Sequence, residues 1–383
     1  MTAAGHPRRL LTIGHSYCVA LNRRLAHEMA RAGGKQWEVT AVAPRFFPGD
    51  LRPIPLEPQP GELCRVAAIG VHLSRVAQLF FYGRGLRAVM RERWDLVHCW
   101  EEPYVIAGGQ VALLSPAASK LVFYTFQNIA KRYAPPFSTI ERRCAKRSAG
   151  WLASGETVAQ TQLERCWSRK PHRVMPLGVD VELFRPDADR GRATRARLGW
   201  NDEGPPVVGF LGRFIEAKGL ELLMRLLDET TSPWRALFVG GGPGEAALRA
   251  WASRHGDRVR IAGGVPHDRV PEYLDAMDLL LAPSQTTARW REQFGRMLIE
   301  AFACGVPVLA SDSGEIPYVV GDAGLIVGER DELGWRRALA DLLESPTRRA
   351  ELAARGRDRA HALYSWPVVA RRHLEFFDEL LAT

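Results

Sequence analysis

The stretch LLLAPSQTTARWREQFGRMLIEAFACGVPVLA, residues 279–310, decides the fold. An apolar run, Leu279–Ala282, leads through a Pro283-Ser284 turn toward a helical segment that ends at Cys304-Gly305. A second apolar run, Val306–Ala310, follows directly. Strand, loop, helix and strand in this order are typical of a parallel sheet whose strands are joined by crossover helices. The stretch therefore predicts an α/β fold.

The same alternation runs through both halves of the chain. Further strand-like runs in the second half are Val207–Leu211, Ala236–Val239, Val259–Ala262 and Leu325–Val327. Those in the first half are Leu10–Gly14, Trp37–Ala43, Leu96–Trp100, Leu121–Thr125, Gly150–Ser154 and Arg173–Pro176. A chain of 383 residues suits two domains of ordinary size. We expect Rossmann-like domains over residues 1–178 and 179–365, with Asp180–Gly204 as the linker, and a final amphipathic helix over 366–383.

Three other segments have a distinct local pattern. Pro44–Pro60 contains six prolines and predicts a loop. Leu73–Arg93 combines arginines with leucine and phenylalanine and predicts a basic amphipathic helix, and Ser138-Thr-Ile-Glu141 is a capping box that predicts the start of another. Basic amphipathic helices are typical of proteins that contact an anionic bilayer. The alternative for Leu73–Arg93 is a core-packed helix with a solvated basic face.

Composition limits the class of protein. The 46% hydrophobic and 25% charged residues are those of a soluble globular protein. The polar start, Met1 to Arg9, does not resemble a signal peptide, so we expect a cytoplasmic protein. The six cysteines form no C-x-x-C pair and no H-E-x-x-H motif is present, so we expect neither disulfides nor a metal site.

The net charge of +9 is unevenly distributed. Residues 1–178 contain 25 Lys and Arg against 12 Asp and Glu, which is +13, whereas residues 179–383 contain 27 against 31, which is −4. This asymmetry indicates that the first half meets an anionic partner, for example a membrane surface. No aromatic and basic recognition motif accompanies the charge, which argues against a nucleic acid.

The second half contains the residues with the strongest chemical pattern. Glu292 and Glu300 are eight positions apart, and Gly295 between them permits close backbone approach at the start of a helix, where anions bind. Arg213 follows one predicted strand and Lys218 opens the next helix, a placement that suits a diphosphate. The alternative is a surface helix with two solvated acids and nearby surface cations.

Taken in order, these pieces resemble the retaining GT-B glycosyltransferases of glycosyltransferase family 4. The matching pieces are Leu177-Gly178-Val179-Asp180 with Phe184, Gly212-Arg213 with Lys218-Gly219, Gly240–Pro243, the E-x7-E pair Glu292 and Glu300, Gly305-Val306-Pro307-Val308, and Gly314-Glu315-Ile316-Pro317. The resemblance implies two Rossmann-like domains that face each other across a cleft, with the last helix packing back on the first domain.

The resemblance also implies a role for each matching residue. Arg213 and Lys218 would hold the donor diphosphate, Glu300 would bind the ribose and Glu292 would contact the transferred sugar. Gly263–Val265 would lie beside the nucleobase. The implied donor-binding set is Gly212, Arg213, Lys218, Gly241, Gly263, Val265, Glu292, Gln293, Phe294, Gly295 and Glu300, and the implied catalytic set is Glu292, Arg213, Lys218 and His98.

The first half departs from the family pattern in two places. The family's glycine-rich loop is replaced by Ile13-Gly-His-Ser-Tyr17, which has one glycine. The family often has two histidines after the strand Leu96–Val97, and here His98 is followed by Trp100 in the second place. We expect the acceptor side of the site to include His15, Ser16, Trp100, Glu101 and Glu102. The alternative for His98 is a buried, hydrogen-bonded residue at a strand end.

The resemblance implies a retaining, metal-independent hexosyltransferase that uses a UDP- or GDP-sugar and no cofactor. The domain of residues 1–178 would bind the acceptor, and that of residues 179–365 the donor. The expected acceptor is a cell-envelope glycolipid or polysaccharide precursor, which would place the enzyme at the inner face of the membrane. The alternatives are a soluble synthase of the sucrose or trehalose type and a non-catalytic protein that binds sugar nucleotides.

Overall fold

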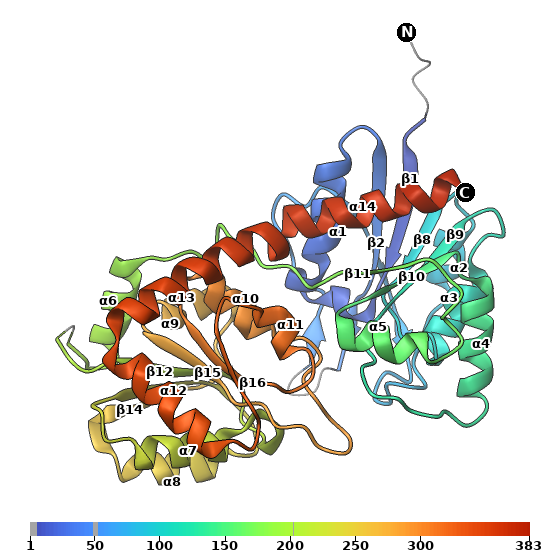
Figure 1. Cartoon of the computed structure of the whole chain (residues 1–383). Coiled ribbons are helices and arrows are strands. Elements are labelled where there is room, and N and C mark those ends of the chain that lie inside the picture. Colours follow the sequence, from blue (N-terminus) through green and yellow to red (C-terminus); the bar gives the residue numbers. More distant parts are fainter. Residues whose placement is uncertain (1–5, 49–52, 202) are drawn as a thin grey trace. The chain divides into compact units, whose positions relative to one another are not determined.

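The chain forms two compact units (Figure 1). The computed structural model describes residues 6–48, 53–201 and 203–383. Residues 1–5 of the polar start, residues 49–52 of the expected proline-rich loop and Asp202 of the expected linker lie outside the described residues. Unit 1 comprises Met1–Pro176 and Trp366–Thr383, and unit 2 comprises Leu177–Ser365.

Unit 1 is built on a sheet of seven parallel strands. In spatial order these are β11 (His172–Val174), β10 (Gly150–Ala153), β9 (Lys120–Thr125), β8 (Leu96–Cys99), β1 (Arg8–Ile13), β2 (Trp37–Pro44) and β5 (Arg65–Ile69). Its helices are η1 (His15–Cys18), α1 (Ala20–Gly33), α2 (Gly85–Met90), α3 (Ile106–Leu114), α4 (Phe137–Arg147), α5 (Glu156–Leu163) and α14 (Trp366–Ala382). The sheet extends from β1 through β2 in one direction and through β8 in the other.

Unit 2 repeats this plan with six parallel strands. In spatial order these are β14 (Val259–Ala262), β13 (Arg235–Gly241), β12 (Val207–Arg213), β15 (Leu279–Ala282), β16 (Val308–Ser311) and β17 (Leu325–Val327). Its α-helices are α6 (Ala188–Arg197), α7 (Leu220–Glu229), α8 (Glu245–Ser253), α9 (Val270–Leu274), α10 (Arg296–Ala303), α11 (Ile316–Val320), α12 (Glu332–Glu344) and α13 (Pro346–Arg359). Here the order reverses between β12 and β15.

The expectation of two Rossmann-like domains is confirmed. Strands β8, β10, β15 and β16 are buried at every residue, as in parallel sheets that are covered on both faces. The final helix, α14, packs along α1 in unit 1, as expected for a helix that returns to the first domain (Figure 1). Among the described residues, no helix combines the length and the apolar character that crossing a bilayer requires.

His98 belongs to the core of unit 1. Its side chain is fully buried, and its Nδ1 lies 3.0 Å from the hydroxyl of Thr12. Its ring packs against His373 and Phe377 of α14, at centroid distances of 5.7 and 5.4 Å. His98 therefore lies in the interface between β8 and α14, in the buried position that the sequence left open as the alternative.

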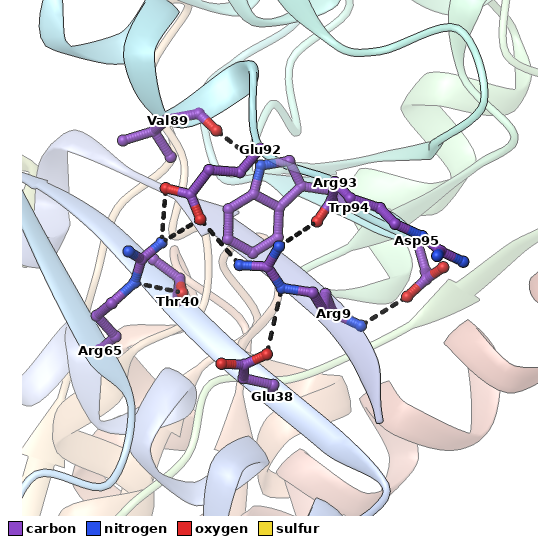
Figure 2. A network of polar contacts seen from close by, with 9 residues as sticks. All are labelled: Arg9, Glu38, Thr40, Arg65, Val89, Glu92, Arg93, Trp94 and Asp95. Carbon is purple, nitrogen blue, oxygen red and sulfur yellow. Dashed lines mark hydrogen bonds and ion pairs between the residues drawn. The ribbon is translucent and has the colours of Figure 1, made fainter. Parts of the chain in front are cut away.

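A polar network links the amino ends of β1 and β5 to the segment that precedes β8 (Figure 2). The Arg9 guanidinium lies over the Trp94 ring, 4.5 Å from its centroid, and donates to Glu92 at 2.8 Å. Arg65 donates to both oxygens of Glu92, and the Arg9 backbone N–H donates to Asp95. Burial opposes ionisation of Glu92, but the hydrogen bonds from Arg65 and Arg9 lower its pKa. This edge of the sheet is thus stabilised by charge pairing.

The helix expected over Leu73–Arg93, with an interruption at Gly83 and Gly85, is confirmed only for Gly85–Met90 and is wrong for the part before Gly83. The segment instead forms an antiparallel hairpin of β6 (Val71–His72) and β7 (Phe81–Tyr82), followed by the short α2. Phe80 and Tyr82 are buried in the core, with 2% and 1% exposure, at the alternate spacing of an extended chain. The burial of these two aromatic side chains overrides the helical pattern of the arginines.

Three further local expectations differ from the structure. Helix α4 begins at Phe137, and Ser138 lies inside it, because Glu141 is buried against Arg165 and does not complete a capping box. The proline-rich stretch contains a short ribbon of β3 (Phe46–Phe47) and β4 (Ile54–Pro55). The expected linker contains α6, which packs on α9 within unit 2.

The buried His373 predicts acid sensitivity of unit 1. Burial lowers its pKa to about 4, whereas an unfolded histidine titrates near 6.5. Its contribution to stability is therefore complete above pH 6.5 and is lost as the unfolded state takes up a proton between pH 6.5 and about 4. We expect the free energy of unfolding to fall by about 3 kcal/mol over this range on account of His373. Urea unfolding at pH 7 and pH 4.5 measures this change.

The His373→Phe variant should show a smaller loss of stability between the two pH values. The exposed His361 provides the control, since His361→Phe should retain the pH dependence of the unsubstituted chain. An equal pH dependence in the unsubstituted chain and in His373→Phe would contradict the prediction.

Candidate functional site

The reversal of strand order in unit 2 gathers the predicted donor-binding residues at one edge of the sheet. In open parallel sheets, ligands bind beyond the carboxyl ends of the strands, where neighbouring crossover connections diverge. Lys218 ends η2 (Glu216–Lys218), which follows β12, and Glu292 lies in the loop between β15 and α10. The two strands are neighbours in the sheet, so residues 74 positions apart in the sequence come into contact.

The Glu292 carboxylate is held in a buried polar cluster. It is only 6% exposed and forms an ion pair with the Lys218 ammonium. The Ser284 hydroxyl, directly after β15, donates to the same carboxylate oxygen at 3.0 Å. The backbone carbonyl of Glu292 accepts from the N–H of Glu315 at 3.0 Å. Both the side chain and the backbone of Glu292 are thus fixed by neighbouring strand ends.

Two glycines make this arrangement possible. Gly295 has φ 81° and precedes α10, so the backbone turns into the helix through a left-handed residue. Gly314 has φ 55°, and a Cβ at this position would lie 2.1 Å from the carbonyl oxygen of Glu292. The glycine in the Gly314-Glu315-Ile316-Pro317 motif is therefore required for the close approach of this loop to Glu292.

Glu300 lies within α10 and has a separate partner. Its carboxylate is 5% exposed, and Oε1 lies 2.8 Å from Nε2 of His267. The His267 ring packs against Phe184 at a centroid distance of 5.1 Å. His267 was not among the predicted residues, although it follows the predicted segment Gly263–Val265 by two positions.

The other predicted donor-side residues differ in exposure. Arg213, Gln293 and Gly263 are exposed, whereas Gly212, Gly241 and Val265 are half-buried. Phe294 is 4% exposed, and its ring packs against Tyr364, so its side chain belongs to the core. Among the predicted donor-side residues, Lys218 and Glu292 contact each other directly through an ion pair.

The loop before Glu292 contributes a residue that the sequence did not indicate. The Lys218 ammonium lies 5.3 Å from the ring centroid of Trp290. The turn that presents this ring is closed by Thr287, whose hydroxyl accepts from the N–H of Trp290 at 3.0 Å. Lys218 thus lies between an aromatic face and a carboxylate.

Unit 1 contains a cavity of about 370 Å³ at the corresponding edge of its sheet. The residues after β1 and β8, the two strands at which the order reverses, supply His15, Glu101 and Glu102 to its lining. Phe47, Phe80 and Tyr104 supply aromatic surface. The cavity therefore combines carboxylates with aromatic rings, as small-molecule sites often do.

Glu101 is the centre of a hydrogen-bond cluster in this cavity. It accepts from Tyr82 and from the backbone N–H of His15, both at 2.5 Å, and lies 2.6 Å from Nδ1 of His15. Burial alone would lower the pKa of His15, but the Glu101 carboxylate raises it above its ordinary value. Burial raises the pKa of Glu102 to about 7, despite hydrogen bonds from Thr125 and Phe126.

The remaining residues expected on the acceptor side lie elsewhere. Trp100 is 7% exposed and is stacked on Phe126, with ring centroids 5.9 Å apart, so it packs inside unit 1. Ser16 lies in η1 and does not line the cavity. Of the five predicted acceptor-side residues, the structure brings together His15, Glu101 and Glu102.

Comparison with known families gives matches to both units. A family described as "Glycosyl transferases group 1" matches residues 193–359, and one described as "Glycosyltransferase Family 4" matches residues 21–183. The two matches follow each other along the chain and include Lys218, Glu292 and Glu300 in the first and Glu101 and Glu102 in the second.

Several curated proteins are similar in sequence. A GDP-mannose-dependent alpha-(1-6)-phosphatidylinositol monomannoside mannosyltransferase of Mycolicibacterium smegmatis is 36% identical over 201 residues, which cover 50% of this chain and 52% of that protein. A D-inositol 3-phosphate glycosyltransferase of Acidothermus cellulolyticus is 29% identical over 363 residues, which cover 87% and 75%. The matched region spans about half the length of the first of these curated relatives.

Solved structures share the fold over nearly the whole chain. A sucrose-phosphate synthase from Thermosynechococcus elongatus has a TM-score of 0.75 at 21% identity, covering 98% of this chain and 99% of that one. The Anabaena protein HepE in complex with UDP and glucose has a TM-score of 0.72 at 17% identity, covering 97% and 100%. At these identities the similarity establishes the fold.

Substitution of Gly314 should destabilise unit 2. Because a Cβ would collide with the Glu292 carbonyl and φ is left-handed, we expect Gly314→Ala to lower the free energy of unfolding by about 1–3 kcal/mol or more. Gly264→Ala is the matched control, since no atom lies within 4 Å of its Cβ position. Thermal unfolding of both variants measures the difference, and equal melting temperatures would refute the predicted collision.

Proposed function

The chain belongs to glycosyltransferase family 4, and we propose that it is a retaining glycosyltransferase that transfers a hexose from a nucleoside diphosphate donor. The observation that supports this most directly is the buried Lys218 and Glu292 pair at the strand reversal of unit 2. A cation and a carboxylate at this point suit the two charged parts of such a donor. These are its diphosphate and the positive charge that develops on the sugar.

In the proposed donor site, Lys218 and Arg213 neutralise the diphosphate. Without donor, the Lys218 ammonium is balanced by Glu292. A bound diphosphate would compete for the ammonium and leave the Glu292 carboxylate to face the transferred sugar. Glu300, oriented by His267, accepts from the ribose hydroxyls, and residues 263–265 lie beside the base. Gly212, Gly241, Gln293, Phe294 and Gly295 line the site with backbone or side-chain polar groups.

The proposed reaction takes place on one face of the sugar. The bond between the anomeric carbon and the β-phosphate oxygen breaks, and a bond from the acceptor oxygen to the same carbon forms on the same side. The proton of the acceptor hydroxyl passes to the leaving phosphate. The transition state resembles an oxocarbenium ion, so a nearby carboxylate stabilises it electrostatically.

We infer both the donor class and the acceptor class from the names of similar proteins. One curated relative is named for GDP-mannose, and a structure of the same fold holds UDP and glucose, which supports a GDP- or UDP-hexose as donor. Two relatives are named for inositol-containing acceptors, one of them a phosphatidylinositol glycolipid. We therefore propose an acceptor that is a cell-envelope glycolipid or polysaccharide precursor, bound by unit 1 on the cytoplasmic side of the membrane. The similarity to sucrose-phosphate synthase concerns the fold and does not favour a soluble synthase.

The donor site predicts which substitutions weaken nucleotide binding. Each of Glu300→Ala and Lys218→Ala removes a charge-assisted hydrogen bond, so we expect the binding free energy to fall by about 1.5–3 kcal/mol. Isothermal calorimetry with UDP and GDP measures it. The exposed Asp322 and Arg337 provide matched controls, because Asp322→Ala and Arg337→Gln remove the same charges elsewhere in unit 2. Unchanged affinity for both nucleotides in both site variants would count against the donor site.

Catalysis should not require a divalent metal. The proposed reason is that Lys218 and Arg213 supply the positive charge that a metal ion provides in other transferases. We expect transfer from the donor to proceed at an unchanged rate in excess EDTA. Loss of activity in EDTA, with recovery on addition of Mn²⁺ or Mg²⁺, would show that the two cations are insufficient.

A further inference from the structure

The hairpin of β6 and β7 presents an unusual surface. Its connecting segment, residues 73–79, which we call the apolar turn, leaves Leu73, Val76 and Leu79 exposed by 63%, 46% and 36%. The turn is ordered by its own backbone hydrogen bonds, Val76 N–H to the Leu73 carbonyl and Leu79 N–H to the Val76 carbonyl. Leu73 adopts φ 54°, a left-handed conformation that is costly for leucine. An ordered turn therefore exposes aliphatic side chains at every third position, and clustered exposure of this kind marks interaction surfaces.

The apolar turn is attached to the start of α3. The backbone N–H of Ile106, the first residue of α3, donates to the carbonyl of Gln78 at 3.1 Å. Gln110 in the same helix exchanges two hydrogen bonds with the backbone of Tyr82, at 2.7 and 2.8 Å. The turn and the amino end of α3 therefore form one surface of unit 1.

A basic segment, residues 131–133, contacts the residue that lies just before the same helix. Tyr104, just before α3, is stacked on Tyr133, with ring centroids 4.1 Å apart. Lys131 and Arg132, which precede Tyr133, are both exposed. From residue 126 to residue 155 the chain contains one acid, Glu141, and it is buried against Arg165. The exposed charge of this part of unit 1 is therefore positive, from Lys131, Arg132, Arg142, Arg143 and Lys146.

The cavity of unit 1 is lined by the apolar turn and by Tyr104, which stacks on Tyr133 of the basic segment. Ser74, Arg75 and Gln78 of the apolar turn and Tyr104 beside the basic segment all line it. Its other lining residues include Glu101 and Glu102. The apolar turn and the basic segment therefore both contact the start of α3, next to a cavity whose lining is polar and aromatic.

We propose that the apolar turn and the basic segment dock unit 1 on an anionic lipid bilayer. The exposed aliphatic side chains of the turn enter the interfacial region, while Lys131, Arg132 and Arg75 pair with lipid phosphates. The cavity then receives the hydrophilic head group of a lipid acceptor that remains in the bilayer. This part of the inference rests on the proposed function, whereas docking itself does not. In this proposal the bilayer contact is made by the tip of a hairpin, and not by the amphipathic helix expected over Leu73–Arg93.

Vesicle sedimentation tests the docking surface. The unsubstituted chain should sediment with phosphatidylcholine vesicles that contain about 30% phosphatidylglycerol, and binding should fall in high salt and on neutral vesicles. Two variants probe the surface: Leu73→Ser with Val76→Ser and Leu79→Ser, and Lys131→Gln with Arg132→Gln. We expect each to lower the vesicle partition coefficient by about tenfold or more.

Matched controls separate the surface from general hydrophobicity and charge. Leu163, Leu333 and Leu363 are exposed by 39%, 54% and 36%, so their joint replacement by Ser removes comparable apolar surface elsewhere. Arg337→Gln with Arg355→Gln removes two exposed charges from unit 2. Both controls should bind vesicles as the unsubstituted chain does. Circular dichroism establishes that each variant is folded.

The outcomes distinguish docking from the proposed function. If the unsubstituted chain does not sediment with anionic vesicles at low salt, or if the controls lose binding as strongly as the two variants, the docking surface is overturned. Calorimetry with UDP and GDP on the same preparations is an independent measurement of the donor site. Loss of vesicle binding with intact nucleotide affinity in the two variants supports the inference.

Discussion

Both units depend on one constraint, which is that the first strand of each sheet pairs in parallel with a neighbour on both of its sides. β1 in unit 1 and β12 in unit 2 each have a parallel neighbour on either side, so the chain must leave each sheet centre in two directions. The crossover connections diverge at that point, and the carboxyl ends of the strands beneath them stay accessible to a ligand. The Lys218 and Glu292 pair and the Glu101 cluster both lie at this position in their own sheets. At the amino end of the unit 1 sheet, the Arg9 and Glu92 network links β1 to the segment before β8 (Figure 2).

The buried charges at the unit 2 site have an energetic consequence. Removing a carboxylate and an ammonium from water costs several kcal/mol per ion unless each finds a partner. Glu292 has Lys218 and Ser284 as partners, and Lys218 has Glu292 and the Trp290 face. Each partner therefore lowers the cost of burying the others, and loss of Lys218 or Glu292 removes the opposite charge that the other one contacts. Well-packed apolar residues of similar volume would avoid this desolvation penalty, so stability alone does not account for the cluster.

The parts of the fold that could be predicted are those that local sequence determines. Leu279–Ala282, Val259–Ala262 and Leu325–Val327 are strands with the bounds that the sequence indicated. For Leu279–Ala282 the reason is that a strand covered on both faces is continuously hydrophobic. Leu73–Arg93 could not be predicted, because its conformation depends on burial of Phe80 and Tyr82 against distant residues. A pattern of exposed arginines contains no information about that burial.

The candidate site likewise contains some residues that the sequence could indicate and others that it could not. Lys218 and Glu292 were found through the ordered family pattern, not through any local signal that they touch. Ser284 follows a predicted strand directly, and that position at a carboxyl end was a signal that could have found it. The burial of His98 could not be predicted, because its partner surface, α14, comes from the far end of the chain. Trp290 gave no signal, since its relation to Lys218 depends on the turn that Thr287 closes.

The assignment of α14 to unit 1 makes unit 2 an insertion within the sequence of unit 1. During synthesis, Met1–Pro176 emerges first but lacks the helix that packs on α1 and covers His98. The apolar residues that α14 covers have no contact with this helix while Leu177–Ser365 is translated. Unit 2, which is continuous in sequence, contains all of its own strands by then. We therefore expect unit 1 to complete its packing only after unit 2 has been translated, because its last helix follows unit 2 in the sequence.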